Sequence, residues 1–179
     1  MVELAFLAVL QMQEPVAGKP TGETLQAFAA KQIPPGMKFA HPAVEGQFGS
    51  PGRHVVLLYR PADDTGEYRG TVLMAAPAGY KRYELPSLEL IPNQFDIEVK
   101  SVFFESVTSG PERELFVLYA YHRTGGTSDD GHACAVYQWR DDQFVRLEEV
   151  EKRIAGLATA AAIRMRLRPP PAVRKSVRK

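Results

Sequence analysis

Residues 114–140, ELFVLYAYHRTGGTSDDGHACAVYQWR, decide the fold class. Two runs of β-branched and aromatic residues, 114–122 and 132–140, flank a connection rich in Gly, Ser and Asp. Such runs favour strands, and a connection of this composition favours an antiparallel hairpin. In 132–140 both alternating sets of positions include apolar residues, so we expect this strand to be covered at least in part on both faces.

Similar runs recur along the chain. They are found at 54–60, 69–76, 80–85, 87–91, 97–107 and 143–148, and the longest of them is expected to bend. The composition, with 45% apolar and 24% charged residues, is typical of a globular protein. We therefore expect a mainly β fold of two related antiparallel meander units, either sandwich-like or resembling part of a propeller.

Helices are expected only near the two ends. The pattern predicts a short helix over about 22–32, with Thr21 as its N-cap, Leu25, Phe28 and Ala29 on one face, and a stop at 34–36. A second helix is predicted over 149–157. Residues 163–168 alternate with period two, so this segment is interpreted as either a helix or a basic edge strand.

The predicted organisation has three parts. Residues 1–20 form an apolar segment and linker, 21–168 form one globular domain with units at about 40–92 and 93–150, and 169–179 form a flexible basic tail. Prolines and glycines in 11–22 predict a segment without regular structure. The apolar run 4–10 is too short to span a bilayer, and Glu3 stands where an export signal has a cation. It is interpreted as a signal remnant or as a segment that docks on the core, and a periplasmic or other extracytoplasmic location is favoured over the cytoplasm.

The two units match each other by pattern. Residues 56–61 align with 117–122 at an offset of 61, and Val72, Tyr80 and Tyr83 align with Val136, Phe144 and Leu147 at an offset of 64. An insertion in the second loop reconciles the two offsets. This predicts an internal repeat, with chance similarity between hairpins as the alternative.

The repeated pattern resembles the FG-GAP class of β-propeller blades, as in the integrin α-subunit head. The resemblance lies in Gly-containing approaches at 48–52 and 107–111, followed by strands such as 55–59 and 116–121, and it covers residues 40–150. The calcium loop of that family is missing from both approaches, so the resemblance implies a style of fold and no calcium. Two units are too few to close a propeller.

Charge is distributed unevenly along the chain. Residues 151–179 contain nine basic residues and one acidic residue, a net charge of +8, whereas 1–150 contain 13 basic and 20 acidic residues, a net charge of −7. A basic tail on an acidic body suggests contact with nucleic acid or an anionic membrane. A solvated tail, or one that folds back on the acidic body, is the favoured interpretation of this segment.

The loop from His122 to Cys134 gathers the main candidate site residues. His122, Asp129, Asp130 and His132 are interpreted as binding residues, and imidazole, carboxylate and thiolate are also ligands for transition metals. Whether this loop binds a metal is left open, because its glycines also suit an ordinary flexible hairpin and Cys134 suits a small core residue. No cofactor is assigned.

Aromatic residues on the neighbouring strands form a second candidate surface. Tyr121, Tyr137 and Trp139 suit contact with a protein or glycan, although the same residues would also serve a core. The chain contains no nucleophile elbow, P-loop or metalloprotease motif. The leading interpretation is therefore a non-enzymatic binding or structural domain. The alternatives are a cytoplasmic domain whose basic tail contacts nucleic acid or membrane, and a metal-dependent enzyme centred on residues 122–134.

Overall fold

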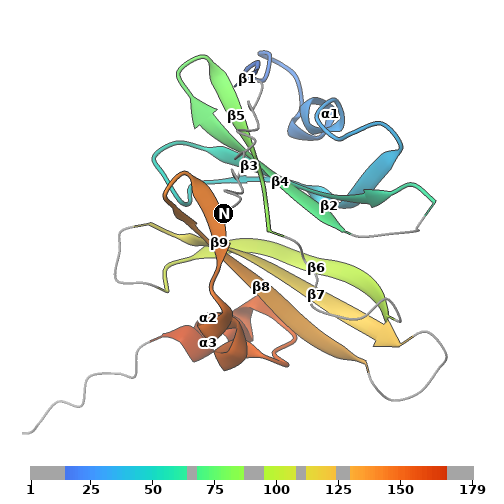
Figure 1. Ribbon diagram of the computed structural model, residues 1–179, viewed down its shortest axis with the longest axis vertical. Helices are drawn as coiled ribbons and strands as arrows, with labels where there is room; N and C mark the ends of the chain where they lie inside the picture. Colours follow the sequence, from blue (N-terminus) through green and yellow to red (C-terminus); the bar gives the residue numbers. More distant parts are fainter. Residues whose placement is uncertain (1–14, 64–67, 87–94, 108–111, 124–129, 169–179) are drawn as a thin grey trace, which may run out of the picture.

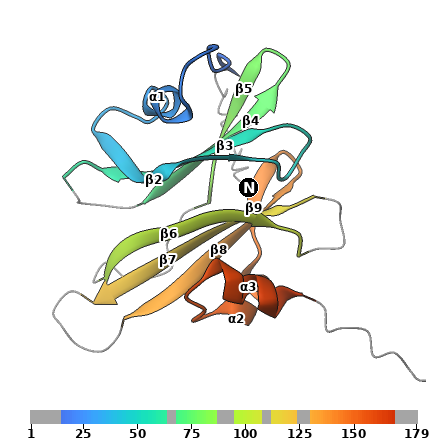
Figure 2. The same cartoon turned by 180° about the vertical axis from the view of Figure 1, so that it is seen from behind.

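The computed structural model describes residues 15–63, 68–86, 95–107, 112–123 and 130–168. Within these residues two antiparallel sheets pack face to face, and helices cover their outer sides (Figure 1 and Figure 2). The predicted mainly β class is confirmed. The strand predicted at 87–91, the apolar run 4–10, Asp129 and the tail 169–179 all lie outside the described residues.

The first sheet, called sheet A, has the strand order β1–β5–β4–β3–β2. Its strands are β1 Pro15–Val16, β2 Met37–Gly46, β3 His54–Pro61, β4 Arg69–Ala76 and β5 Gly79–Glu84. Two of them were not predicted. The segment expected to be irregular contributes β1, which pairs with β5 through Pro15 and Lys81. β2 begins at Met37 and contains Pro42, which is tolerated because β2 lies at the edge of the sheet.

The second sheet, called sheet B, has the order β6–β7–β8–β9. Its strands are β6 Phe95–Glu105, β7 Glu114–Arg123, β8 Gly131–Arg140 and β9 Gln143–Arg146. The two central strands β7 and β8 correspond to the predicted strands 114–122 and 132–140. The predicted bend in β6 corresponds to a shift in pairing between Val99 and Ser101.

Three clusters of buried side chains hold the layers together. The inter-sheet core lies between sheets A and B, and Val56, Val117 and Tyr137 belong to it. Along β7 the neighbouring residues Phe116 and Leu118 point the other way, into a cluster under the C-terminal helices, here called the C-terminal core. This explains why β7 is apolar at consecutive positions, since a strand buried on both faces has no polar side. β8 behaves in the same way, as predicted.

Helix α1 (Leu25–Ala30) covers the outer face of sheet A. Phe28 and Ala29 are buried, as predicted. The prediction of Thr21 as the N-cap was wrong. The cap is Thr24, whose hydroxyl accepts a hydrogen bond from the Ala27 N–H at 3.2 Å, so the helix starts one turn later than expected.

Helices α2 (Glu148–Ile154) and α3 (Ala160–Leu167) cover the outer face of sheet B (Figure 2). The alternative of an edge strand over 163–168 was therefore wrong. Thr159 caps α3 by accepting from the Ala162 N–H at 3.1 Å. Ile163 is fully buried, whereas Met165, two residues later, is 70% exposed, so the period-two alternation does not correspond to burial. Burial of Ile163 alone contributes roughly 2 kcal/mol to docking of the helix.

Edge strands β2 and β6 are both irregular and lie against each other across the sandwich. β2 shifts register twice, between Phe39 and His41 and between His41 and Val44. β6 shifts once, at Lys100, whose side chain is exposed. Such bulges and edge lysines interrupt the regular row of hydrogen-bonding groups that a further strand would need.

The two meanders, β2–β5 and β6–β9, have the same strand order. At one of the two predicted offsets, however, the aligned side chains point into different cores. At the offset of 61, Val56 and Val117 both point into the inter-sheet core. At the offset of 64, Val72 points into that core whereas Val136 points into the C-terminal core. A one-residue difference in a strand reverses its faces, so β4 and β8 do not superpose residue for residue at that offset.

Candidate functional site

His122, Asp130 and His132 lie at the end of sheet B where β7 ends and β8 begins. The Nδ1 atom of His122 is 3.1 Å from the Asp130 Oδ2 atom, and both side chains are at least half exposed. His132 pairs across the strands with Ala120, two residues before His122, so both histidines lie on the outer face of the sheet.

Cys134 does not belong to this exposed group. It lies in the C-terminal core, where burial raises the pKa of its thiol. The thiolate, which is the form that binds metal or attacks as a nucleophile, is therefore disfavoured. Among the residues that the structure describes, no three His, Cys, Asp or Glu side chains are placed to hold one metal ion.

The aromatic candidates point to the opposite side, between the sheets. Tyr137 is fully buried, and Trp139 packs edge-on against Tyr83 with ring centroids 4.7 Å apart. Tyr121 lies across Gly131, where an added Cβ would come within 2.3 Å of the tyrosine Oη atom. These side chains belong to the inter-sheet core or its rim, so the candidate binding residues divide between two faces of sheet B.

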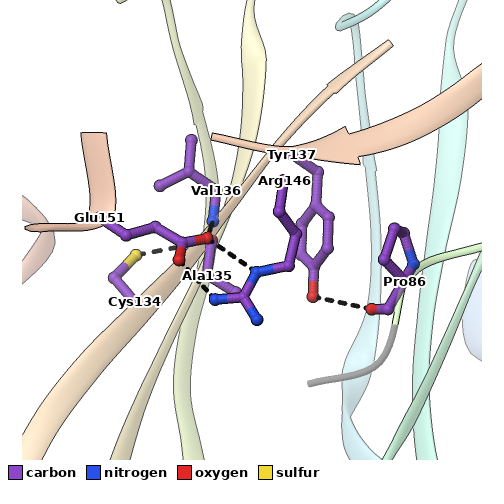
Figure 3. Close-up of polar contacts among 7 residues, drawn as sticks. All are labelled: Pro86, Cys134, Ala135, Val136, Tyr137, Arg146 and Glu151. Atoms are coloured by element: carbon purple, nitrogen blue, oxygen red, sulfur yellow. Dashed lines mark hydrogen bonds and ion pairs between the residues drawn. The ribbon is translucent and has the colours of Figure 1, made fainter. Parts of the chain in front are cut away.

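A largely buried ion pair that the sequence did not suggest joins α2 to sheet B (Figure 3). The Glu151 carboxylate accepts from the Arg146 Nε atom at 3.0 Å and also from its Nη2 atom. The two side chains are only 17% and 12% exposed. The same carboxylate accepts from the Val136 backbone N–H at 2.9 Å. Since β9 ends at Arg146, Glu151 takes the place of the strand that would otherwise receive that N–H.

Two buried tyrosines lie beside this ion pair. The Tyr137 hydroxyl donates to the Pro86 carbonyl at 3.3 Å, as Figure 3 shows, whereas the Tyr119 hydroxyl has no partner among the described residues. Burial raises the pKa of both phenols, so both stay protonated near neutral pH and neither is a general base there. The Glu151 carboxylate, through Arg146 and the Val136 N–H, is what anchors α2 to sheet B.

His54 is a second buried polar group, and both of its ring nitrogens are used. The Ala75 backbone N–H donates to Nδ1 at 2.9 Å, so the proton lies on Nε2, which donates to the Ser50 carbonyl at 3.0 Å. Burial lowers the pKa of His54, and the smaller effect of the Ser50 bond opposes this. The neutral ring therefore links the loop before β3 to strand β4.

The free energy of unfolding is expected to fall as the pH drops below about 6.5, the ordinary His pKa, because the unfolded chain binds a proton at His54 more readily. The loss should continue until the pH passes the lower pKa of the folded state. His54→Asn keeps an acceptor for Ala75 but does not titrate. Urea midpoints at mildly acidic and neutral pH should therefore differ less for this variant than for the wild type, and equal differences would contradict the role assigned to His54.

The C-terminal helices carry several cations. Arg164 is held by Glu105 at 2.9 Å and lies over the ring of Phe103, and Lys152 pairs with Glu149 at 2.6 Å. Three further arginines are exposed and form no ion pair among the described residues. These three, here called the arginine surface, are Arg153, Arg166 and Arg168.

Comparison with family models, with curated proteins and with solved structures gave no match. Within the described residues, no helix has the length and apolar character needed to cross a membrane.

Proposed function

We propose that this chain is a non-enzymatic binding domain that contacts an anionic partner through the arginine surface and the basic residues that follow it. The observation that carries this proposal is the exposure of Arg153, Arg166 and Arg168 without ion-pair partners in the described structure. Elsewhere on the same layer, cations such as Arg164 are neutralised by acidic neighbours. Unpaired guanidinium groups are suited to phosphate, which they can bind with two parallel hydrogen bonds.

The placement of these arginines supports contact with a large partner. Ile154 and Ile163 pack α2 and α3 against sheet B, so the arginines project from helices that are docked on the domain. The remainder of the chain, residues 1–150, has a net charge of −7 and is expected to turn away from a negative surface. Electrostatic attraction would therefore also orient the domain.

The other expected binding surface is less well supported. A protein or glycan ligand was expected at Tyr121, Tyr137 and Trp139, but Tyr137 is fully buried and Trp139 packs within the sandwich. The arginine surface is exposed as it stands.

The test measures binding of the full chain to two anionic probes, phosphatidylserine-containing vesicles and a short DNA duplex, at several salt concentrations. Changing Arg153, Arg166 and Arg168 to Gln should weaken binding by roughly 100-fold at low salt, from about 1 kcal/mol for each cation near an anionic surface. The control changes three other exposed cations, Arg69, Lys81 and Arg113, to Gln. It has the same net charge and should lose far less affinity.

Two outcomes would overturn the proposal. One is the absence of salt-dependent binding to both probes. The other is an equal loss in the control, which would show that overall charge and not the arginine surface determines binding.

We also infer that the two meanders descend from one duplicated unit. The shared strand order and the equal facing of Val56 and Val117 support this. The FG-GAP-like style of fold remains part of the same proposal.

A further inference from the structure

Met165 is the one large hydrophobic side chain that is exposed in the described part of the chain. It is 70% exposed and lies in α3 between Arg164 and Arg166. Charge attraction explains the arginines of this helix but not the methionine. A single exposed apolar residue would need no explanation elsewhere, but here Arg166 and Arg168, which are already assigned to binding, follow it closely in sequence.

The two faces of α3 differ clearly. Ile163 and Leu167 pack into the C-terminal core, whereas Ala161, Met165 and Arg168 recur at helical spacing on the solvent side. Arg166 flanks this side. The outward face therefore combines one flexible apolar side chain with cations, and cations near an anionic bilayer surface gain electrostatic attraction.

Nucleic acid fits this face less well. Residues 151–179 contain no aromatic residue to stack on a base. A duplex would meet only the cations and would leave Met165 in water. An anionic lipid surface accepts both, because phosphate groups pair with the arginines while the thioether enters the boundary with the acyl chains.

We infer that the partner is an anionic phospholipid surface, with Met165 inserted at its boundary and Arg166 and Arg168 on the lipid phosphates. This inference rests on the proposed function and specifies its partner. α3 lies along the surface and does not cross it.

The experiment compares wild type, Met165→Ser and Met165→Leu, each as the full chain. The probes are vesicles of phosphatidylcholine with one-fifth phosphatidylserine, vesicles of phosphatidylcholine alone, and a DNA duplex. Met165→Ser should bind the anionic vesicles about fivefold more weakly, because it removes most of the apolar area available for insertion. Met165→Leu should bind them as the wild type does. Because the side chain is exposed, all three proteins should share one urea midpoint.

The possible outcomes distinguish the lipid inference from the proposed function on which it rests. Unchanged vesicle binding by Met165→Ser would contradict the insertion of Met165 into the lipid surface. Binding to the duplex without binding to anionic vesicles would overturn the lipid inference and leave the anionic binding domain in place. Absence of binding to both anionic probes, or equal binding to neutral and anionic vesicles, would overturn both.

Discussion

Replacing Glu151 with Ala should lower the free energy of unfolding by about 3 kcal/mol, one of the two largest effects expected in this protein. The change leaves the Arg146 guanidinium without its partner in a largely buried position. It also removes the acceptor of the Val136 N–H, and a buried donor without a partner is costly. The measurement is urea unfolding followed by circular dichroism and by the fluorescence of Trp139, the only tryptophan.

Two matched variants separate these contributions. Glu151→Gln keeps an oxygen for the Val136 N–H and loses only the charge, so it should cost about half as much. Tyr119→Phe removes a neighbouring buried hydroxyl that has no partner in the described structure, and should leave stability unchanged or raise it. A cost below about 0.5 kcal/mol for Glu151→Ala, the range of ordinary surface changes, would show that the ion pair does not anchor α2.

Replacing Phe116 with Ala should cost about 4 kcal/mol. Phe116 is fully buried and stacks on Phe103 with ring centroids 4.9 Å apart, directly under the C-terminal helices. The substitution removes apolar contacts and leaves a cavity in a strand that is closed on both faces and has little room to relax. Urea unfolding measures the cost.

Phe116→Leu is the control, since it keeps most of the volume and should cost about 1.5 kcal/mol or less. Near-equal stability of the Ala variant and the wild type would mean that the C-terminal helices are held in some other way. Domains of this kind have total stabilities of about 5–15 kcal/mol, so Phe116→Ala combined with Glu151→Ala should unfold a large part of the population.

The strands that sequence predicted well are those with dense apolar patterns. β4 was predicted to the residue, and β3, β7 and β8 to within a few residues, because β-branched and aromatic runs are rare outside strands. β2 was missed because Pro42 and two bulges break its alternation. β2 is stabilised by its pairing with β3, and the residue pattern of a single strand contains no information about its pairing partner.

The strand alternative for residues 163–168 failed for a different reason. Ile163, Met165 and Leu167 alternate with arginines, and this suggested a strand, but arginine, alanine and methionine are all good helix formers. The Thr159 cap and the burial of Ile163 then stabilise a helix here.

The candidate site was predictable only where its members are close in sequence. His122, Asp130 and His132 belong to one hairpin, and the structure brings them together. Arg146, Glu151 and Val136 come from three different elements, and nothing in their neighbours marks them as partners. The sequence also did not show which face of sheet B the aromatic residues occupy, since both faces of β8 carry apolar side chains.

The irregular edges β2 and β6 have a consequence for the protein at high concentration. A regular open edge could act as a template on which another chain adds its own strand, and repetition of that step builds fibres. Here the two edges that meet on one side of the sandwich are both bulged, one contains a proline, and the other exposes Lys100. The irregular edges therefore disfavour growth by strand addition on this side of the molecule.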